Sequence, residues 1–557
     1  MPSPVPPPHT RGARAAAFAA LGASPFDLLV IGGGITGAGI ARDAALRGLK
    51  TALVERDDFA SGTSSRSSRL VHGGVRYLEH GYLHLVFEAS RERRTLLSIA
   101  PHLVHPLAFT WPVYAGARVP RWKLGAGLLL YDALALFRNV GTHRQLSVTE
   151  VLASEPALRP DGLQGGAQYW DAATDDARLT LANAIAAAEA GAVVVNHASV
   201  CELVHSGERV VGAIVADAFN GGDTTTVRAS VTVNAAGPWS TAIRRLDKPD
   251  APAVVQGTKG VHLAVPAARV GNRGAVTLLS VVDGRVMFVL PFGSLTIVGT
   301  TDTATTATPD SVRASRGDIA YLLESVNAAF PGAALGDTDV VSAWAGIRPL
   351  SASVRETGTD PASLSREHSI DTSAGGVISI SGGKLTTYRS MAAEVVDTVE
   401  RALGRAVTAG VTQSLLLPGG ALGATSDTIT AAAERVGAGR VGARDVATRL
   451  VKAYGDRWPL VWAVAERDST LAQPLVAGLP YIAAEVVYAG EYEMACTLSD
   501  ILMRRTQIAF ETRDAGRAVA PRVAQLLAPL RGWDSTAQRA AVEQYGADAE
   551  RIFGIDP

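Results

Sequence analysis

The pattern of apolar and polar positions is clearest between residues 26 and 56, FDLLVIGGGITGAGIARDAALRGLKTALVER. An apolar run ends in three glycines, a segment rich in small apolar residues follows, and a second apolar run closes on an acidic side chain. This is the pattern of a βαβ unit that binds a dinucleotide. We therefore predict two parallel strands joined by a helix, with the fold beginning near Phe26.

Later parts of the chain carry three other patterns. Short apolar runs at residues 191–195, 230–236 and 377–381 predict that the first domain is assembled from separate segments. Between them, apolar runs bounded by Gly and Asp turns predict an inserted antiparallel sheet; these runs are residues 255–266, 281–291 and 295–300. After residue 420 the sequence is rich in Ala, Arg and Glu at helical spacing.

Together these patterns predict an α/β fold: a Rossmann-like dinucleotide-binding domain, an inserted antiparallel-sheet substrate domain and an all-helical C-terminal domain. The Pro-rich and Ala-rich start of the chain is expected to be a disordered extension. The expected boundaries are 1–24 for the extension; 25–105, 165–245 and 340–410 for the first domain; 106–164 and 246–339 for a substrate-binding cap; and 411–557 for the helical domain.

Composition narrows the function classes. The 557 residues have a formal net charge of −1, so nucleic acid is not an expected partner. Cys201 and Cys496 provide neither a disulfide framework nor a metal-ligand cluster, which predicts no metal and fits a reducing cytoplasm. The longest apolar candidate, Leu124 to Phe137, has 14 residues and contains Asp132, too short to span a bilayer. A buried helix is preferred for this basic-flanked segment, and a helix in a membrane interface is the alternative.

Gly32, Gly34 and Gly37 form a G-x-G-x-x-G fingerprint directly after the first apolar run. The first glycine permits a tight turn, the second admits backbone N–H groups to a pyrophosphate, and the third lets the helix pack on the strand. Glu55 is placed to accept hydrogen bonds from a ribose. No second fingerprint has this setting, whereas NAD-linked flavoproteins usually build two such units. One dinucleotide, FAD, is therefore predicted.

Two further segments carry groups suited to line a cofactor. The hydroxyl-rich loop TSSRSSR at residues 63–69 is followed by the pair Gly73-Gly74, and a solvated loop is the alternative interpretation. Residues 377–387 predict a strand, a glycine pair and a helix start, whose N–H groups would stabilise negative charge on a reduced flavin ring. Lys384 would stand beside that ring, and a structural turn is the alternative.

His262, Arg348 and Arg366 are the candidates for catalysis on an anionic substrate that carries a hydroxyl group. Such a substrate needs a base and a guanidinium fork for its phosphate or carboxylate, and these side chains are of the right types. Taken singly, each is more typical of a surface charge or of a buried histidine with a partner.

A set of motifs spread along the chain is similar to the FAD-dependent glycerol-3-phosphate dehydrogenases. The resemblance covers about Phe26 to at least Ile508. HGGVRYLE and SGGKLTTYR are more specific than the glycine fingerprint, which many flavin oxidases share. The motifs are GGGITGAGIARDAALRG, TSSRSSRLVHGGVRYLEHG, WDAATDDARL, VNAAGPWS, KGVHL, VGTTDT, GIRPL, SGGKLTTYR and MRRT.

The resemblance implies oxidation of sn-glycerol 3-phosphate to dihydroxyacetone phosphate, with hydride passing to FAD and electrons then to a membrane quinone. It also implies a cytoplasmic protein peripheral to the inner face of the cell membrane. His262 would take the C2 hydroxyl proton, Arg348 and Arg76 would hold the phosphate, and Lys384 would stabilise the reduced ring. The implied substrate pocket is Arg76, Tyr77, His262, Arg348 and Arg366; the implied FAD site is Gly32, Gly34, Gly37, Glu55, Thr63, Ser64, Ser65, Gly73, Gly74, Gly383, Lys384 and Thr386.

Some alternatives stay open at this point. Related oxidases pass electrons to O₂, and flavin amine or amino-acid oxidases share the cradle and the inserted sheet. A flavin-bearing scaffold protein without turnover would keep the cradle and lose the pocket residues. No calcium-binding loop of the Asp-x-Asp-x-Asp-Gly type follows the C-terminal domain, so calcium control is not predicted. The oligomeric state, including a homodimer, is left open.

Overall fold

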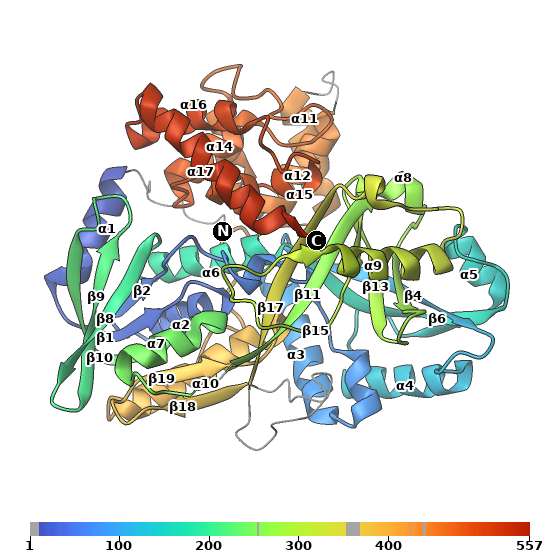
Figure 1. Ribbon diagram of the computed structural model, residues 1–557, viewed down its shortest axis with the longest axis horizontal. Helices are drawn as coiled ribbons and strands as arrows, with labels where there is room; N and C mark the ends of the chain where they lie inside the picture. Colours follow the sequence, from blue (N-terminus) through green and yellow to red (C-terminus); the bar gives the residue numbers. More distant parts are fainter. Residues whose placement is uncertain (1–10, 253–254, 352–367, 424, 438–441) are drawn as a thin grey trace.

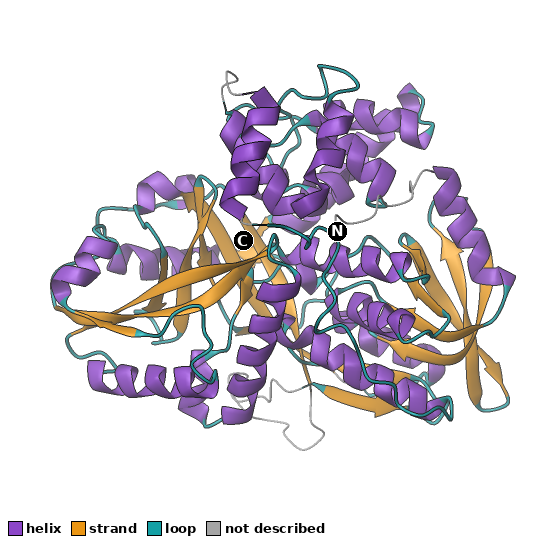
Figure 2. Ribbon diagram, turned by 180° about the vertical axis from the view of Figure 1, so that it is seen from behind, coloured by secondary structure: helices purple, strands orange, loops and turns teal. Residues whose placement is uncertain are grey.

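The computed structural model describes residues 11–252, 255–351, 368–423, 425–437 and 442–557. Two β-sheets lie side by side, and a helical domain from the C-terminal part of the chain lies against the region where they meet (Figure 1). Seen from behind, the helices of this domain form a layer separate from the strands (Figure 2). Within the described ranges, no helix combines the length and apolar character needed to cross a membrane.

The first sheet carries the predicted βαβ unit. Its central strand pairs in parallel with neighbours on both sides, Leu28 opposite Thr51 and Val30 opposite Val233. Fully buried aliphatic side chains fill both faces of this strand, as expected for a parallel sheet covered by helices. The strands in spatial order are β18 (Ser369–Thr372), β19 (Ile378–Ser381), β10 (Thr224–Asn234), β1 (Phe26–Ile31), β2 (Thr51–Val54) and β7 (Val193–Val195), with β8 (Ala198–Ser206) and β9 (Arg209–Asp217) extending β10.

Three helices of the first domain pack together: α2 (Ile35–Leu46), α6 (Asp176–Glu189) and α10 (Tyr388–Ala402). A short 3₁₀ turn, η3 (Gly237–Trp239), leads from β10 into α7 (Ser240–Asp247). The strands come from three separate stretches of the chain, residues 26–54, 193–234 and 369–381, so this sheet is assembled from separated segments.

The second sheet forms the cap and is mainly antiparallel, as predicted for the inserted segment. It includes β6 and β17, although the predicted boundaries at residues 165 and 340 assign most of both strands to the first domain. A strand belongs to the sheet in which it pairs, and the sequence alone does not show which strands pair. In spatial order the sheet is β15 (Thr303–Ala304), β11 (Val255–Pro266), β14 (Leu295–Gly299), β13 (Val286–Phe292), β12 (Ala275–Leu279), β4 (Val104–Tyr114), β6 (Leu163–Thr174) and β3 (Leu70–Val71), with β17 (Ser342–Ser351) on β11 and β5 (Arg144–Leu146) on β6.

Helices of the cap lie beside this sheet. In chain order they are α3 (Leu83–Ile99), α4 (Arg121–Leu134), α5 (Val148–Ser154), α8 (Ala267–Val270) and α9 (Arg316–Ala329). The segment before α3 is the 3₁₀ turn η2 (Val75–His80), which packs against both α3 and α4.

The C-terminal domain is helical, which confirms the prediction. Its helices are α11 (Thr425–Gly437), α12 (Ala443–Tyr454), α13 (Trp458–Ala465), α14 (Ala483–Tyr492), α15 (Ile508–Glu511), α16 (Ala520–Arg531) and α17 (Ser535–Phe553). The chain then closes with β20 (Ile555–Asp556), which pairs in parallel with β16 (Ala314–Ser315) of the cap.

A buried ionic cluster joins this domain to the first one. Arg504 and Arg505, in a π-helical turn, each place a nitrogen 2.7 Å from a carboxylate oxygen of Asp58. Asp58 is fully buried, and although burial raises its pKa, the two guanidinium groups hold that pKa below the usual value. Removing one partner of such a cluster leaves a buried charge uncompensated. The cluster therefore fixes the segment that follows β2.

The expectation of a disordered extension over residues 1–24 is wrong for residues 11–23. These residues form α1 (Arg11–Ala23), and Arg14 pairs with Asp217 of β9 at 2.9 Å. Phe18 and Leu21 lie three positions apart on one helix face and are buried against the first domain. The Ala-rich composition that suggested disorder also has a high helix propensity. Residues 1–10 lie outside the described ranges.

Candidate active site

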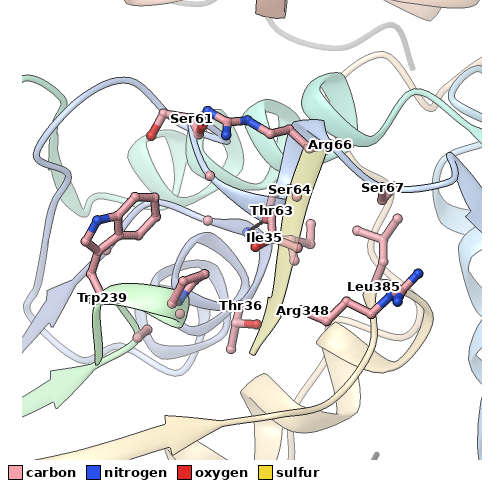
Figure 3. Close-up of a pocket in the computed structure, with 18 of the residues that line it drawn as sticks. Ile35, Thr36, Ser61, Thr63, Ser64, Arg66, Ser67, Trp239, Arg348 and Leu385 are labelled. Carbon is pink, nitrogen blue, oxygen red and sulfur yellow. Dashed lines mark hydrogen bonds between the residues drawn. The ribbon is translucent and has the colours of Figure 1, made fainter. Parts of the chain in front are cut away.

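A cavity of about 530 Å³ lies where the carboxyl ends of the parallel strands face the cap. This is where open α/β sheets bind their ligands, and the volume is in the range of small-molecule sites. The cavity is lined by the ends of β1, β2, β10 and β19, the loop at residues 61–68, and strands β11 and β17 of the cap. Figure 3 shows Trp239 well separated from Arg348 and Leu385 across this cavity.

The glycine fingerprint forms a cradle that excludes side chains. Gly32 has a φ of +109°, and a Cβ on it would lie 2.7 Å from the carbonyl oxygen of Ala235. A Cβ on Gly37 would lie 1.9 Å from the carbonyl oxygen of Gly32. Gly34 is different, because a Cβ there would meet only Ser64 Oγ, at 3.3 Å, and otherwise project into open space. The cradle thus leaves room for a pyrophosphate at the N-terminus of α2.

Glu55 lies at the end of β2 and lines the same part of the cavity. Its Oε2 accepts the N–H of Gly33 at 2.6 Å and its Oε1 accepts the N–H of Asp57 at 2.8 Å. Burial raises the pKa of this carboxyl group, and the two backbone donors oppose that shift. Each oxygen keeps a further lone pair, so the group is able to accept a hydrogen bond from a ribose.

The far part of the cavity is built from cap strands. His262 on β11 lies opposite Trp344 on β17, and the two rings stack at a centroid distance of 5.7 Å. His262 Nε2 lies 2.9 Å from Ser68 Oγ, while Nδ1 has no hydrogen-bond partner among the described residues. Burial and, to a smaller extent, the charges of Arg348 and Arg69 lower the pKa of His262 to about 3. The imidazole is therefore neutral at neutral pH.

Arg348 on β17 projects into the cavity beside β11. Its Nη1 donates to Asp302 Oδ1 at 2.8 Å, and its Nη2 donates to Thr300 Oγ1 at 3.0 Å. A Cβ on Gly260 would lie 2.8 Å from Arg348 Nη2, so this glycine gives the guanidinium its path across the neighbouring strand. Nη2 also donates to the carbonyl oxygen of Thr301 at 3.2 Å, and the guanidinium keeps its positive charge, which suits an anion in the cavity.

Lys384 stands at the start of the short 3₁₀ turn that leads into α10, after the glycine pair predicted from sequence. Its Nζ lies 3.7 Å from the centroid of the Tyr77 ring, a cation–π contact. Thr386 Oγ1 accepts the N–H of His72 at 3.1 Å, which ties this turn to the segment that carries Tyr77. The strand, glycine pair and helix start are thus confirmed.

The structure brings most of the predicted site residues into this one cavity. Those lining it are Gly32, Gly34, Glu55, Thr63, Ser64, Tyr77, His262, Arg348, Gly383, Lys384 and Thr386. Gly37 packs beneath the cradle, and Ser65, Gly73 and Gly74 are not on the wall of the cavity. Gly74 has a φ of +80°, and its missing Cβ makes room for the Tyr77 ring. The side chain of Arg76 and the whole of Arg366 lie outside the described part of the chain.

Several contacts at the site were not predicted from sequence. Ser68 binds His262, Asp302 binds Arg348, and Trp239 lines the opposite end of the cavity. All three residues lie inside motifs quoted for the resemblance, and Ser68 also belongs to the hydroxyl-rich loop expected to line the cofactor. Their partners are set by strand register, which is not visible in the sequence.

One group of metal-ligand types occurs elsewhere among the described residues. His197, Cys496 and Asp500 place ligand atoms within 4.8 Å of one another. Asp500 already pairs with His197 at 3.0 Å and with Arg504 at 2.8 Å. We therefore assign the group to the ionic junction between the first and C-terminal domains.

Comparison with known proteins shows the family to which the chain belongs. The family profile described as FAD dependent oxidoreductase matches residues 27–389, and the profile described as the C-terminal domain of alpha-glycerophosphate oxidase matches residues 410–538. Glycerol-3-phosphate dehydrogenase 2 of Mycobacterium tuberculosis is 40% identical over 96% of this chain and 90% of its own length. The mitochondrial glycerol-3-phosphate dehydrogenase of Macaca fascicularis is 39% identical over 93% of this chain and 72% of its own.

Solved structures give the same result. The glycerol-3-phosphate dehydrogenase from Bacillus halodurans, complexed with FAD, has a TM-score of 0.80, is 32% identical and covers 98% of both chains. Glycine oxidase from Geobacillus kaustophilus, with a TM-score of 0.53 and 21% identity over 71% of this chain, shares the fold alone. The protein therefore belongs to the FAD-dependent oxidoreductases, within them to the glycerol-3-phosphate dehydrogenases, and its cofactor is FAD.

Proposed function

We propose that this protein oxidises sn-glycerol 3-phosphate to dihydroxyacetone phosphate and passes the electrons to a membrane quinone. One observation carries the proposal: a single cavity joins a dinucleotide cradle to a neutral buried imidazole and a guanidinium. FAD, when bound, supplies the acceptor for the hydride that leaves C2 of the substrate.

His262 is proposed as the base that takes the C2 hydroxyl proton. Its ring is held in place by the Trp344 stack and by the hydrogen bond to Ser68. A neutral imidazole has a free lone pair to accept a proton, and a negatively charged substrate nearby raises the pKa of a protonated imidazole. Binding of the phosphate beside Arg348 would therefore strengthen the base when it is needed.

Arg348 is proposed to bind the phosphate group. Its guanidinium is fixed by Asp302 and Thr300, so little side-chain freedom is lost when an anion binds. Arg76, Arg366 and Tyr77 remain the other predicted substrate contacts. Lys384 is proposed to stabilise the negative charge that builds on the reduced cofactor, from its position over Tyr77.

An exposed apolar surface supports the quinone as acceptor. On α4 one face is buried, whereas Trp122 is 76% exposed and Leu129 is 55% exposed. Phe137, just after the helix, is 60% exposed, and Leu83 at the start of α3 is 43% exposed. Groups of large, solvent-exposed apolar side chains mark interaction surfaces. Basic residues at the ends of α4 suit the anionic headgroups of a membrane. We propose that this surface lies on the membrane.

The position of this surface relative to the cavity also favours the proposal. Both α3 and α4 contact η2, the turn that carries the cavity residue Tyr77. They lie along the edge of the molecule opposite the C-terminal domain (Figure 1). A quinone that leaves the membrane here would need to travel only past η2 to reach the site.

The donor is tested by steady-state reduction of an artificial electron acceptor. We expect turnover with sn-glycerol 3-phosphate and none with glycerol or with a mixture of amino acids. Turnover with an amino acid alone would contradict the proposal and favour an amino-acid oxidase.

The acceptor is tested separately by comparing the reduction of a short-chain quinone with the consumption of O₂. Faster quinone reduction supports the proposal, and comparable O₂ consumption would favour an oxidase.

The membrane surface is tested with two variants. Trp122→Ala and Phe137→Ala should reduce binding to anionic vesicles without changing turnover with a soluble acceptor.

A further inference from the structure

A cluster of two exposed charged side chains and one half-buried indole lies at the cradle end of the cavity. The Arg56 guanidinium carbon lies 4.9 Å from the centroid of the Trp239 ring. Asp310 joins both: its Oδ2 accepts the indole N–H of Trp239 at 3.0 Å, and its Oδ1 accepts Arg56 Nη2 at 2.8 Å. The three residues come from the segment after β2, from η3 and from the cap loop between β15 and β16.

The cluster stands at the boundary between the cavity and solvent. Arg56 and Trp239 both line the cavity, and the Arg56 side chain is also 43% exposed, so it stands between cavity and solvent. A Cβ on Gly62 would lie 2.8 Å from the Trp239 ring, so the indole reaches from η3 to the opposite loop of the cradle. Asp310 does not line the cavity but holds the two residues that do.

The cradle end is where the adenosine half of the cofactor would lie. Arg56 directly follows Glu55, the predicted ribose acceptor. The neighbouring wall is apolar, with Val200, Ile243 and Leu246, and suits a flat base. Arg348 lies across the cavity from Trp239 (Figure 3), and His262, on the strand paired with that of Arg348, also lines the cavity.

We propose that Asp310, Arg56 and Trp239 form a clasp over the adenosine half of FAD that slows release of the cofactor. For FAD to leave past this mouth, the indole must swing away from Gly62, which breaks its hydrogen bond to Asp310 and its contact with Arg56. The inference concerns FAD retention and does not depend on the proposed substrate or acceptor.

Two further observations fit the clasp. Although burial raises the pKa of Asp310, its bonds to Trp239 and Arg56 hold that pKa below the usual value, as expected for a carboxylate with close positive and N–H partners. The loop that carries Asp310 is anchored on its C-terminal side, because Ala314 and Ser315 pair with Ile555 and Asp556 at the end of the chain.

The test measures the rate at which FAD leaves the holoprotein. FAD fluorescence is followed after dilution into an excess of an apo-flavoprotein that traps the released cofactor. Exposed ion pairs and cation–π contacts are individually weak, so we expect Asp310→Ala to release FAD about 3- to 10-fold faster. Trp239→Ala should exceed that, at about 10-fold or more, and Trp239→Phe should fall between Trp239→Ala and the parent.

The chain offers a matched control in the C-terminal domain. Arg435 lies over the Trp458 ring at 5.7 Å and pairs with Glu466 at 3.1 Å, and both side chains of that pair are nearly half exposed, as in the Arg56–Asp310 pair. Glu466→Ala removes the same kind of contact far from the cavity and should leave the release rate unchanged.

Two results would overturn the proposal. One is release of FAD at the parent rate from both Asp310→Ala and Trp239→Ala. The other is faster release from Asp310→Ala together with a melting temperature of the apo protein lower than that of Glu466→Ala, because general loosening would then account for it.

Discussion

The two ends of the cavity present different kinds of binding group, backbone groups at one end and side chains at the other. At the cradle end the binding groups are backbone N–H groups and a glycine turn that lie within one βαβ unit, residues 26–56. At the far end they are side chains, His262 and Arg348, on adjacent antiparallel strands of the cap. The first end is local in sequence, whereas the second exists only when β11, β14 and β17 pair in the correct register.

This difference separates binding from chemistry. The cradle offers the shape and partial charge that any dinucleotide needs, and many flavin enzymes share it. The cap end offers a neutral imidazole and a fixed cation, which we propose to act on the substrate. We therefore expect changes at the cap end to lower turnover with FAD retained, and changes at the cradle end to lower FAD affinity.

The largest effect is expected for His262→Ala. Loss of a general base typically costs about 10²- to 10⁴-fold in rate, so turnover should fall by that range while FAD content stays at one per chain. Steady-state kinetics and the flavin absorbance of the purified variant measure both quantities. His205→Ala, which does not line the cavity, is the control. Unchanged turnover would remove His262 from the mechanism.

A smaller loss is expected for Arg348→Lys. A lysine has one point charge and cannot hold both Asp302 and a phosphate as a fork does, so kcat/KM should fall by about 30-fold, mostly through KM. Inhibition by inorganic phosphate should weaken in parallel. Arg269→Lys on α8 serves as a control for the substitution itself. If KM is unchanged, the phosphate site lies elsewhere.

Gly34→Ala tests the cradle end. Gly34 has a φ of −71°, which an alanine adopts without strain, and its Cβ would point into the space left for the pyrophosphate. The variant should fold and lose about 10-fold in FAD affinity, measured by fluorescence titration of the apo protein. Gly127→Ala in α4, where a Cβ meets nothing within 4 Å, should keep the parent affinity. Parent affinity in Gly34→Ala would show that the cofactor does not approach this backbone.

The last prediction concerns pH and compares the parent with His262→Gln. Burial keeps native His262 neutral down to a pKa of about 3, whereas the unfolded chain takes up this proton near 6.5. The contribution of this pKa difference to the free energy of unfolding is present in full above pH 6.5 and is lost as the pH falls toward 3. Between pH 6.5 and 5 the parent should lose about 2 kcal/mol relative to the variant. Parallel pH profiles in thermal unfolding would mean that the ring is already protonated or solvated.

The sequence allowed the cradle, the helix start at Lys384 and the helical C-terminal domain to be predicted, because turns, caps and periodicity are local signals. The hydrogen bond between Ser68 and His262 joins residues 194 positions apart, and no local rule predicts it. The predicted boundaries placed β17 in the first domain instead of the cap for the same reason, since an apolar run does not show which strand it pairs with. In α1, composition suggested disorder although Phe18 and Leu21 carried a helical spacing.

The central claim is that glycerol 3-phosphate, bound at the cap end, reduces the FAD held at the cradle end. The most direct test is an anaerobic titration of the purified protein, followed by flavin absorbance, with sn-glycerol 3-phosphate and with glycerol and amino acids as controls. Bleaching of the oxidised flavin by sn-glycerol 3-phosphate alone is the predicted result. Full FAD occupancy without bleaching by sn-glycerol 3-phosphate would contradict the assignment of His262 and Arg348 to its oxidation.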